Sequence, residues 1–290
     1  MKRLIIIATL AFALAACTNG AYIEESFVET EQTECFKEFT FSCSGDFFLT
    51  IAPITRGSLV VDNKEMTDLW VLDYKGGVLQ QQLHQVNTDA DFGTPSMTLS
   101  TGEHHLYFII SRSTTPTLDT ENHKLTFAKV LDTFYKDLSL NVSATSNSNQ
   151  SVNLDRVVTK LKITFTDEIP TNAATFDITP HTWYYGIDYF TGEPCEASTD
   201  GIITVNIPSG SLGKANESVN IFSISSATEW TTDIALNCKT SANVILGQAT
   251  IQDAPFKRNR VSEYTGPLFG TEPDMTFSFE DWDESYIATW

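Results

Sequence analysis

Basic residues are scarce in this 290-residue chain. Only 18 Lys and Arg side chains stand against 37 Asp and Glu, which gives a formal net charge of −19 at pH 7. A surface of that sign repels phosphate backbones, so the composition argues against a nucleic-acid-binding protein. Aromatic residues are plentiful, with 19 Phe, 9 Tyr and 5 Trp, which excludes disorder over the whole length. The length allows two ordinary domains, each with its own core.

Catalytic signatures are absent as well. The sequence has no Gly-x-Ser-x-Gly elbow, no His-Glu-x-x-His motif and no Gly-rich phosphate-binding loop. We therefore predict a non-enzymatic protein with no catalytic residue and no cofactor.

Metal-ligating residues lack a recognised spacing. His104 and His105 fall at the start of a predicted strand, which sends the two rings to opposite faces, so one metal ion cannot readily use both. The acidic segments 89–91 and 280–284 could offer oxygen ligands to calcium. Neither has the spacing of a known calcium loop, and solvated acidic turns explain both. We expect no metal site.

Cysteines are few. Beyond Cys17 the chain has Cys35, Cys43, Cys195 and Cys238, and no pair has zinc-site spacing. Two disulfides are possible in an oxidising compartment, with three connectivities that the sequence does not separate. Cys35 and Cys43 on one straight strand would lie about 26 Å apart, too far to bridge. A Cys195–Cys238 bridge and free buried thiols both remain open.

Long apolar runs are limited to residues 4–16, which are too few to span a bilayer as a permanent helix. Lys2 and Arg3 precede this run, and Leu-Ala-Ala at 14–16 leads directly into Cys17. A basic start, an apolar segment and small residues before a cleavage point are typical of a secretory signal. We predict a signal peptide over 1–16 and lipidation of Cys17, which anchors the chain to a membrane leaflet. The alternative is an ordinary cleaved signal with an incidental cysteine. Residues 17–34 are predicted to form a lipidated tether.

From residue 36 onward the chain alternates apolar and polar residues in short segments separated by turns, which predicts an all-β fold of β-sandwiches. The clearest predicted strands are listed by residue range: 69–74, 78–83, 106–110, 157–165, 202–207, 219–224 and 244–251. Residues 127–138 have helical apolar spacing and predict one short helix or turn. The Ser/Asn run 143–151 predicts a loop at a domain boundary, with sandwiches over 35–150 and 151–290.

Three consecutive aromatic residues, Trp183, Tyr184 and Tyr185, precede Gly186. They could form a platform on which a sugar ring stacks. The simpler interpretation is a strand with Trp183 and Tyr185 buried on one face and Tyr184 outside. The first interpretation would make the protein a surface glycan-binding lipoprotein.

The two ends of the chain carry a similar strand pattern. Segment 38–43 directs Phe39, Phe41 and Cys43 to one face, and segment 275–280 does the same with Met275, Phe277 and Phe279. Two such segments could fill the same kind of groove in a sandwich. If a subunit lost its own first strand, the last strand of a neighbour could replace it as a donor strand. The alternative is that both are ordinary strands of their own domains.

An isolated basic residue, Arg56, is followed by Gly57 and Ser58 between the first two predicted strands. The Arg56–Gly57 bond would suit an arginine-specific protease if it were exposed. An arginine in a turn is common, so this bond alone says little.

These features together resemble the fimbrillin superfamily of Bacteroidales, the subunits of lipoprotein-derived (type V) pili. The resemblance covers nearly the whole chain and rests on several weak motifs in order: the Cys17 lipobox, Thr55-Arg56, and segments 66–77, 152–163, 258–261 and 277–282. It implies two transthyretin-like β-sandwich domains, cleavage after Arg56, and polymerisation through a donor strand of the next subunit. The family contains stalk, anchor and tip members, and the resemblance does not choose among them.

The leading hypothesis is thus a structural fimbrial or adhesion subunit at the outer membrane and cell surface. Its expected partners are other fimbrial subunits, the outer membrane through the lipid, and host or bacterial surface ligands. The alternative is the surface glycan-binding lipoprotein.

Overall fold

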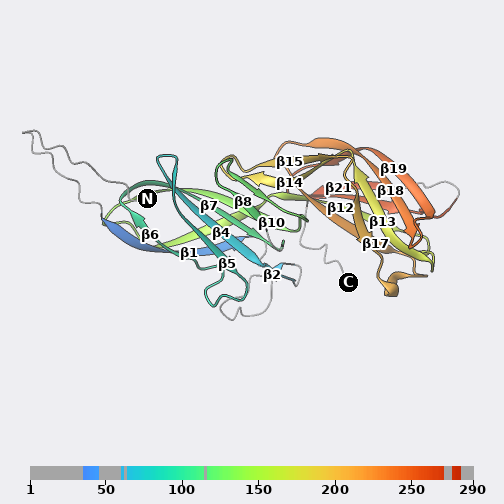
Figure 1. Ribbon diagram of the computed structural model, residues 1–290, viewed down its shortest axis with the longest axis horizontal. Helices are drawn as coiled ribbons and strands as arrows, with labels where there is room; N and C mark the ends of the chain where they lie inside the picture. The colour runs from blue at the N-terminus through green and yellow to red at the C-terminus, as the bar shows by residue number, and fades with distance from the viewer. Residues whose placement is uncertain (1–34, 46–59, 62–63, 114–115, 271–275, 282–290) are drawn as a thin grey trace, which may run out of the picture. The chain divides into compact units, whose positions relative to one another are not determined.

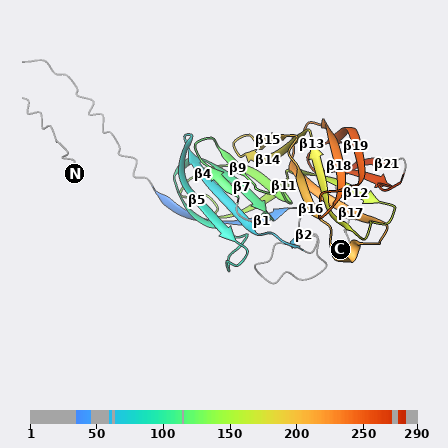
Figure 2. The same cartoon turned by 45° about the vertical axis from the view of Figure 1, so that its right-hand side comes forward.

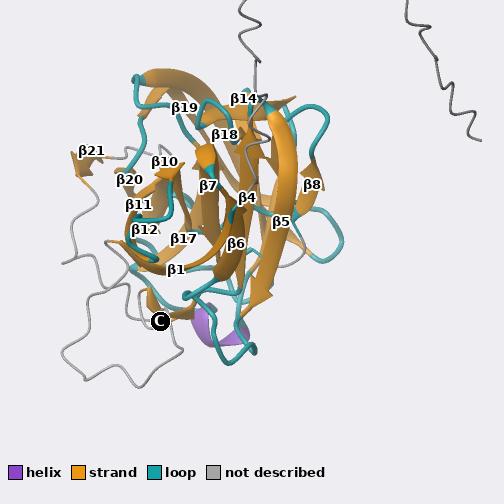
Figure 3. Cartoon of the chain, turned by 90° about the vertical axis from the view of Figure 1, so that its left-hand side faces the viewer, coloured by secondary structure: helices purple, strands orange, loops and turns teal. Residues whose placement is uncertain are grey.

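The computed structural model describes residues 35–45, 60–61, 64–113, 116–270 and 276–281. Within these ranges the fold is all-β, as predicted, and the only helical element is a 3₁₀ turn, η1 (Ser209–Ser211). Figure 3 shows this turn in purple among the strands. No helix in the described part has the length and apolar character to cross a membrane.

The first sheet has seven strands in the order β5-β4-β7-β10-β11-β1-β6. Along the chain these are β1 (Phe36–Gly45), β4 (Asp68–Lys75), β5 (Val78–Val86), β6 (Ser96–Ser100), β7 (Gly102–Ser111), β10 (Thr133–Val142) and β11 (Asn149–Arg156). Figure 1 shows them in blue to green. Leu83 of β5 and Leu99 of β6, from opposite ends of the order, belong to one apolar cluster. The sheet therefore curls around its own core, which we call the first core.

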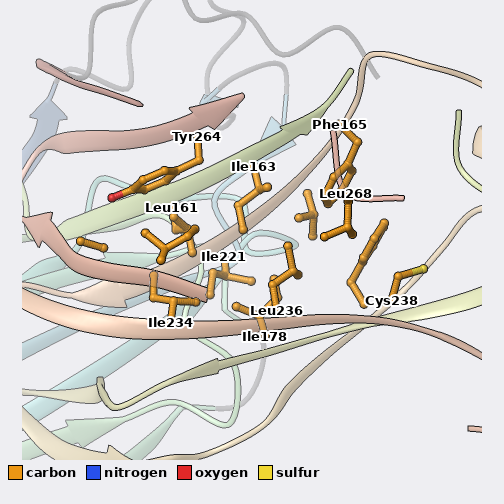
Figure 4. Packing of buried hydrophobic residues seen from close by; sticks show 14 of the residues in the cluster. Leu161, Ile163, Phe165, Ile178, Ile221, Ile234, Leu236, Cys238, Tyr264 and Leu268 are labelled. Carbon is orange, nitrogen blue, oxygen red and sulfur yellow. The ribbon is translucent and has the colours of Figure 1, made fainter. Parts of the chain in front are cut away.

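Two four-stranded sheets enclose a second core. One has the order β17-β12-β20-β21 and the other β16-β13-β18-β19. Their bounds are β12 (Val158–Phe165), β13 (Ala173–Pro180), β16 (Ile203–Asn206), β17 (Glu217–Ile224), β18 (Trp230–Thr240), β19 (Ile245–Phe256), β20 (Arg260–Gly266) and β21 (Thr276–Asp281). Figure 4 shows Leu161 and Ile163 of β12 packed with Ile234 and Leu236 of β18. Both sheets thus contribute to the same apolar interior.

A further four-stranded sheet, β15-β14-β9-β8, combines strands from both halves of the chain. It contains β8 (Thr117–Asp119), β9 (Lys124–Thr126), β14 (Thr182–Asp188) and β15 (Glu193–Thr199), while β2 (Val60–Val61) and β3 (Lys64–Glu65) form a separate pair. Figure 2 shows β9, β14 and β15. Nearby, the Tyr74 and Tyr189 hydroxyls share a 2.8 Å hydrogen bond, and the Arg156 guanidinium donates to buried Asp132 at 2.9 Å. The same guanidinium also donates to the Asn259 side chain at 3.1 Å. Backbone pairing, a hydroxyl pair and this second Arg156 bond therefore join the two halves.

The predicted strands form close to their expected positions. The hairpin between β4 and β5 turns at Gly76 and Gly77, both with positive φ (57° and 77°), as a two-residue turn between twisted strands requires. The strand predicted over 106–110 is part of the longer β7, and the one over 244–251 is part of β19. Alternation of apolar residues was thus a sound guide to where strands lie.

The predicted helix over 127–138 is wrong. Thr133 to Val142 form β10, which pairs with β7 along its whole length. The four-residue spacing of Phe134 and Leu138 also satisfies a period of two, and Leu140 continues it on the same face. A ten-residue ladder beside a buried strand supplies hydrogen bonds and apolar packing that a short isolated helix lacks.

The Ser/Asn run is a loop only through residue 148. Asn149, Gln150 and Ser151 instead begin β11, where they pair with Thr40, Phe41 and Ser42 of β1. β11 spans residues on both sides of the predicted division after residue 150. That division stays a prediction.

Candidate functional site

β1 lies inside the first sheet rather than at its edge. It runs parallel to β11, with Phe41 opposite Gln150 and Cys43 opposite Val152. On its other side it runs antiparallel to β6, with Phe39 opposite Met97. Residues 36–40 pair with β6 and residues 40–45 with β11, so the two ladders meet at Thr40 and β1 joins the two neighbouring strands within the sheet.

The alternation in β1 sends three apolar side chains into the first core. Phe39 and Phe41 are fully buried and Cys43 is nearly so, while Ser42 between them is exposed. The Phe41 ring packs on Phe108 of β7 at 5.3 Å between centroids. Burial of each Phe stabilises the fold by about 1.5–3 kcal/mol. Burial also raises the pKa of the Cys43 thiol to about 12, because an apolar interior disfavours the thiolate.

β21 carries the similar pattern but lies at the edge of its sheet. Its backbone runs antiparallel to β20, with Phe277 opposite Tyr264 and Phe279 opposite Ser262. Its other side has no strand beside it in the described part of the chain. Met275 lies outside the described residues. The use of Met275, Phe277 and Phe279 as a donor strand stays a prediction.

Other predicted site residues also lie outside the described ranges. These are Cys17, the predicted lipidation site, and Arg56 and Gly57, the predicted cleavage site. The predicted signal peptide (1–16) and tether (17–34) also lie outside the described residues. Arg56 and Gly57 belong to the connection that leaves β1 at Gly45 and reaches β2 at Val60.

The aromatic triplet lies on β14, and the structure separates its members. Trp183 is 1% exposed, and its indole N–H donates to the Phe222 carbonyl at 2.9 Å. Its ring packs edge-on against Phe256 in the second core. Tyr184 and Tyr185 are half-buried. Trp183 presents no face to a sugar ring and so does not fit the predicted glycan platform.

The two adjacent histidines point in opposite directions, as expected. His104 is buried and His105 is about half exposed. Among the described residues no group of three His, Cys, Asp or Glu side chains could hold a metal ion. The Asp89 carboxylate instead accepts a hydrogen bond from the Val86 amide at 2.8 Å, which is the role of an acidic turn residue.

The four described cysteines have free thiols. Cys43 lies in the first core and Cys238 in the second, while Cys35 is exposed and Cys195 is intermediate. Burial raises the pKa of Cys238 to about 11. The two buried thiols act as small apolar side chains.

A buried polar group that the sequence interpretation missed lies at one end of the first core. His104 Nδ1 lies 2.7 Å from the Asp73 carboxylate, and His104 Nε2 lies 2.9 Å from the Ser100 carbonyl oxygen. The Lys75 ammonium donates to the Ser100 hydroxyl at 2.8 Å. The Gln81 amide donates to the Thr98 carbonyl at 2.8 Å. We call these links between β6 and strands β4, β5 and β7 the polar clasp.

A signal for the polar clasp was present in the sequence. Asp73 shares its strand face with Leu69 and Val71, and His104 shares its face with Leu106 and Phe108. A carboxylate and an imidazole on apolar faces must find partners. The sequence does not show that these two partners face each other, because their strands are about thirty residues apart.

The sequence matches no protein-family model and no curated protein. Solved structures resemble the fold despite low identity. A "putative cell adhesion protein" from Bacteroides ovatus is 10% identical over 86% of this chain and 99% of its own, with a TM-score of 0.52. A "putative adhesin" from Bacteroides thetaiotaomicron is 9% identical over 84% and 96%, with a TM-score of 0.51. The chain shares the fold of these two proteins.

A third structure is the tip fimbrial protein Mfa3 from Porphyromonas gingivalis. It is 11% identical over 86% of this chain and all of its own, with a TM-score of 0.45.

Proposed function

We propose that the chain is a structural subunit of a surface pilus or adhesion fibre. It joins other subunits by exchange of a β-strand, or it anchors such a fibre to the outer membrane. The fold shared with proteins described as an adhesin and a cell adhesion protein supports a role in adhesion. The role is structural rather than catalytic.

The observation that carries this proposal is the position of β1. This strand comes first in the described chain, yet it lies between β11 and β6 with three side chains in the first core. Loss of β1 would leave the backbone groups of β11 and β6 that face it without partners, and it would open an apolar groove. A strand from another molecule with the same alternation could restore both the hydrogen bonds and the buried area. A cut in the connection after β1 would permit that exchange, and Arg56–Gly57 is the bond we propose for it.

The proposed donor is the last strand of a neighbouring subunit. Segment 275–279 repeats the alternation of β1, and among the described strands β21 pairs with β20 only. A strand with one ladder loses fewer hydrogen bonds when it leaves its sheet than a strand with two. Partners would be copies of this chain or related subunits.

The remaining parts of the proposal concern the domains and the attachment to the membrane. We propose two transthyretin-like sandwiches over residues 35–150 and 151–290. Export would follow the signal peptide 1–16, with lipid on Cys17 and residues 17–34 as a tether to the outer membrane.

The deciding measurement is the N-terminal sequence and mass of the protein taken from its native cell surface. A start at Gly57 supports a polymerising subunit that has lost its lipid and β1. A lipidated start at Cys17 supports an anchor that keeps both. A protein that stays a monodisperse monomer, in cells whose pili are unchanged by its deletion, contradicts the proposal.

A further inference from the structure

β6 depends on β1 for its backbone pairing. In the described chain its only paired neighbour is β1, and the ladder extends beyond the strand through bonds such as Thr101 N–H to the Cys35 carbonyl at 2.8 Å. The opposite edge of β6 faces β5 without a ladder. A hollow of about 260 Å³ lies there, lined by residues of β5 and β6, by Asp73 of β4, by His104 of β7 and by Phe36 of β1. Strand exchange at β1 would thus leave β6 with no backbone partner.

We propose that the polar clasp holds β6 in place as a wall of the groove while β1 is absent. This inference rests on the proposed function and assigns a role to residues outside the exchanging strand. Its key feature is that every link of the clasp comes from β4, β5 or β7. None comes from β1, so all of them persist when β1 leaves.

The centre of the clasp is His104. Both acceptors that face its ring are oxygens, the Asp73 carboxylate and the Ser100 carbonyl. The ring thus spans the two oxygens, with one nitrogen within hydrogen-bond distance of each. Asp73 is fully buried and His104 is 1% exposed, so breaking their contacts carries a desolvation cost. Loss of the imidazole would remove the partner of Asp73 Oδ1 and of the Ser100 carbonyl, and would leave the carboxylate with the Gln81 amide at 3.4 Å from Oδ2.

Apolar packing alone would hold β6 less well in the open groove. Met97 and Leu99 of β6 point into the first core, where they share a cluster with Phe39 and Phe41. When β1 departs, that cluster loses both aromatic rings and the inner face of β6 meets solvent. The clasp is then the part of the attachment that stays unchanged. The groove keeps the width and register that an incoming strand needs.

The test compares two neighbouring histidines in the full chain. His104→Gln removes the clasp centre, and His105→Gln is the matched control because His105 is about half exposed on the opposite face. Hydrogen exchange of backbone amides is measured by segment. We expect β6 amides (Ser96–Ser100) to exchange about tenfold faster in His104→Gln, with β17 and β18 of the second core unchanged. His105→Gln should match the parent. Parent-like exchange of β6 in His104→Gln overturns the inference.

If His104→Gln fails to fold, two milder variants can be measured in the same way. Gln81→Ala removes the link to the Thr98 carbonyl, and Ser100→Ala removes the link to Lys75 while the strand backbone is kept. Each should accelerate β6 exchange by several-fold without affecting β10. If neither does so, the links are incidental and the inference falls.

A second experiment separates this inference from the proposed function. The full chain is cut with an arginine-specific protease and offered a synthetic peptide of residues 272–284. If the parent binds the peptide and His104→Gln binds it at least tenfold more weakly, the inference stands. If both bind equally, the inference is overturned and the proposed function survives. If neither binds but β6 exchange is still faster in His104→Gln, the clasp stands and strand exchange fails.

Discussion

β1 and β21 share the same alternation of apolar and polar residues, but they occupy different positions in their sheets. β1 lies between two strands and sends two Phe side chains into a core, whereas β21, in the part of the chain that the structure describes, pairs with β20 alone at the edge of its sheet. Alternation determines which side chains share a face; it does not determine how many neighbours a strand acquires. The number of neighbours decides how readily a strand can leave.

This difference assigns the two strands opposite parts in the proposed exchange. A strand paired on both sides leaves only when both ladders break, and this is why we propose a proteolytic cut for β1. An edge strand breaks one ladder, so β21 can leave without a cut. With the same pattern of residues, β1 is thus suited to be replaced, and β21 of a neighbouring subunit is suited to replace it.

The largest expected effect is at Phe41. Phe41→Asp places an unpaired carboxylate in the first core, against Phe108. The lost packing alone costs about 3–5 kcal/mol, and an uncompensated buried charge adds to this. Because whole domains are stable by only about 5–15 kcal/mol, we expect the seven-stranded sheet around the first core to unfold, as measured by circular dichroism and denaturant titration. Ser42→Asp, at the exposed neighbouring position, is the control and should fold. A stable Phe41→Asp protein would mean that β1 is dispensable.

Phe277→Asp tests the other side of the comparison. We expect a monomer that folds, because the strand lies at an edge, but a complete loss of assembly, because a carboxylate cannot enter an apolar groove without a partner. Thermal unfolding and electron microscopy of fibres measure the two properties. The control is Thr276→Asp, at an exposed position of the same strand. If Phe277→Asp does not fold as a monomer, residues 275–279 belong to the core of their own domain.

The sequence predicted the fold class and most strands because period-two alternation reflects burial of one sheet face. It did not predict β10, since Phe134 and Leu138 satisfy both helical and strand spacing and only the ladder with β7 decides between them. The burial of Trp183 agrees with the simpler interpretation, because the second core supplies Phe256 and the Phe222 carbonyl as partners, whereas Tyr184 and Tyr185 are both half-buried and do not alternate as that interpretation expected. Those partners are distant in sequence, so the local pattern of residues does not predict these contacts.

The candidate site was predicted only in part. The inward faces of Phe39, Phe41 and Cys43 follow from the local pattern and are confirmed. The pairing of β1 with β11 joins residues more than a hundred positions apart. The Asp73–His104 contact likewise depends on the pairing of β4 with β7. Such features come from topology, which alternation leaves undetermined.

The smallest expected effect, and the one that reports most directly on β1, is the reactivity of Cys43. The thiolate is the species that alkylates, and burial raises the Cys43 pKa from 9.0 to about 12. At pH 8 the thiolate population is therefore about 1,000-fold lower than for an ordinary thiol. Because the neutral thiol is favoured in the fold, its contribution to stability is complete below pH 9 and is lost as the pH rises towards 12.

In the intact chain at pH 8 we expect a maleimide to label exposed Cys35 and to spare Cys43 and Cys238, as read by mass spectrometry of peptides. Once the chain is cut after β1 and a donor strand displaces it, Cys43 should become reactive because it leaves with β1. Cys238, in the second core, should stay protected and serves as the internal control. Labelling of Cys43 in the intact chain at the rate of Cys35 would show that β1 already leaves its groove without a cut. Equal gains at both buried thiols would instead mean general unfolding. Only a selective gain at Cys43 makes β1 the strand that exchanges.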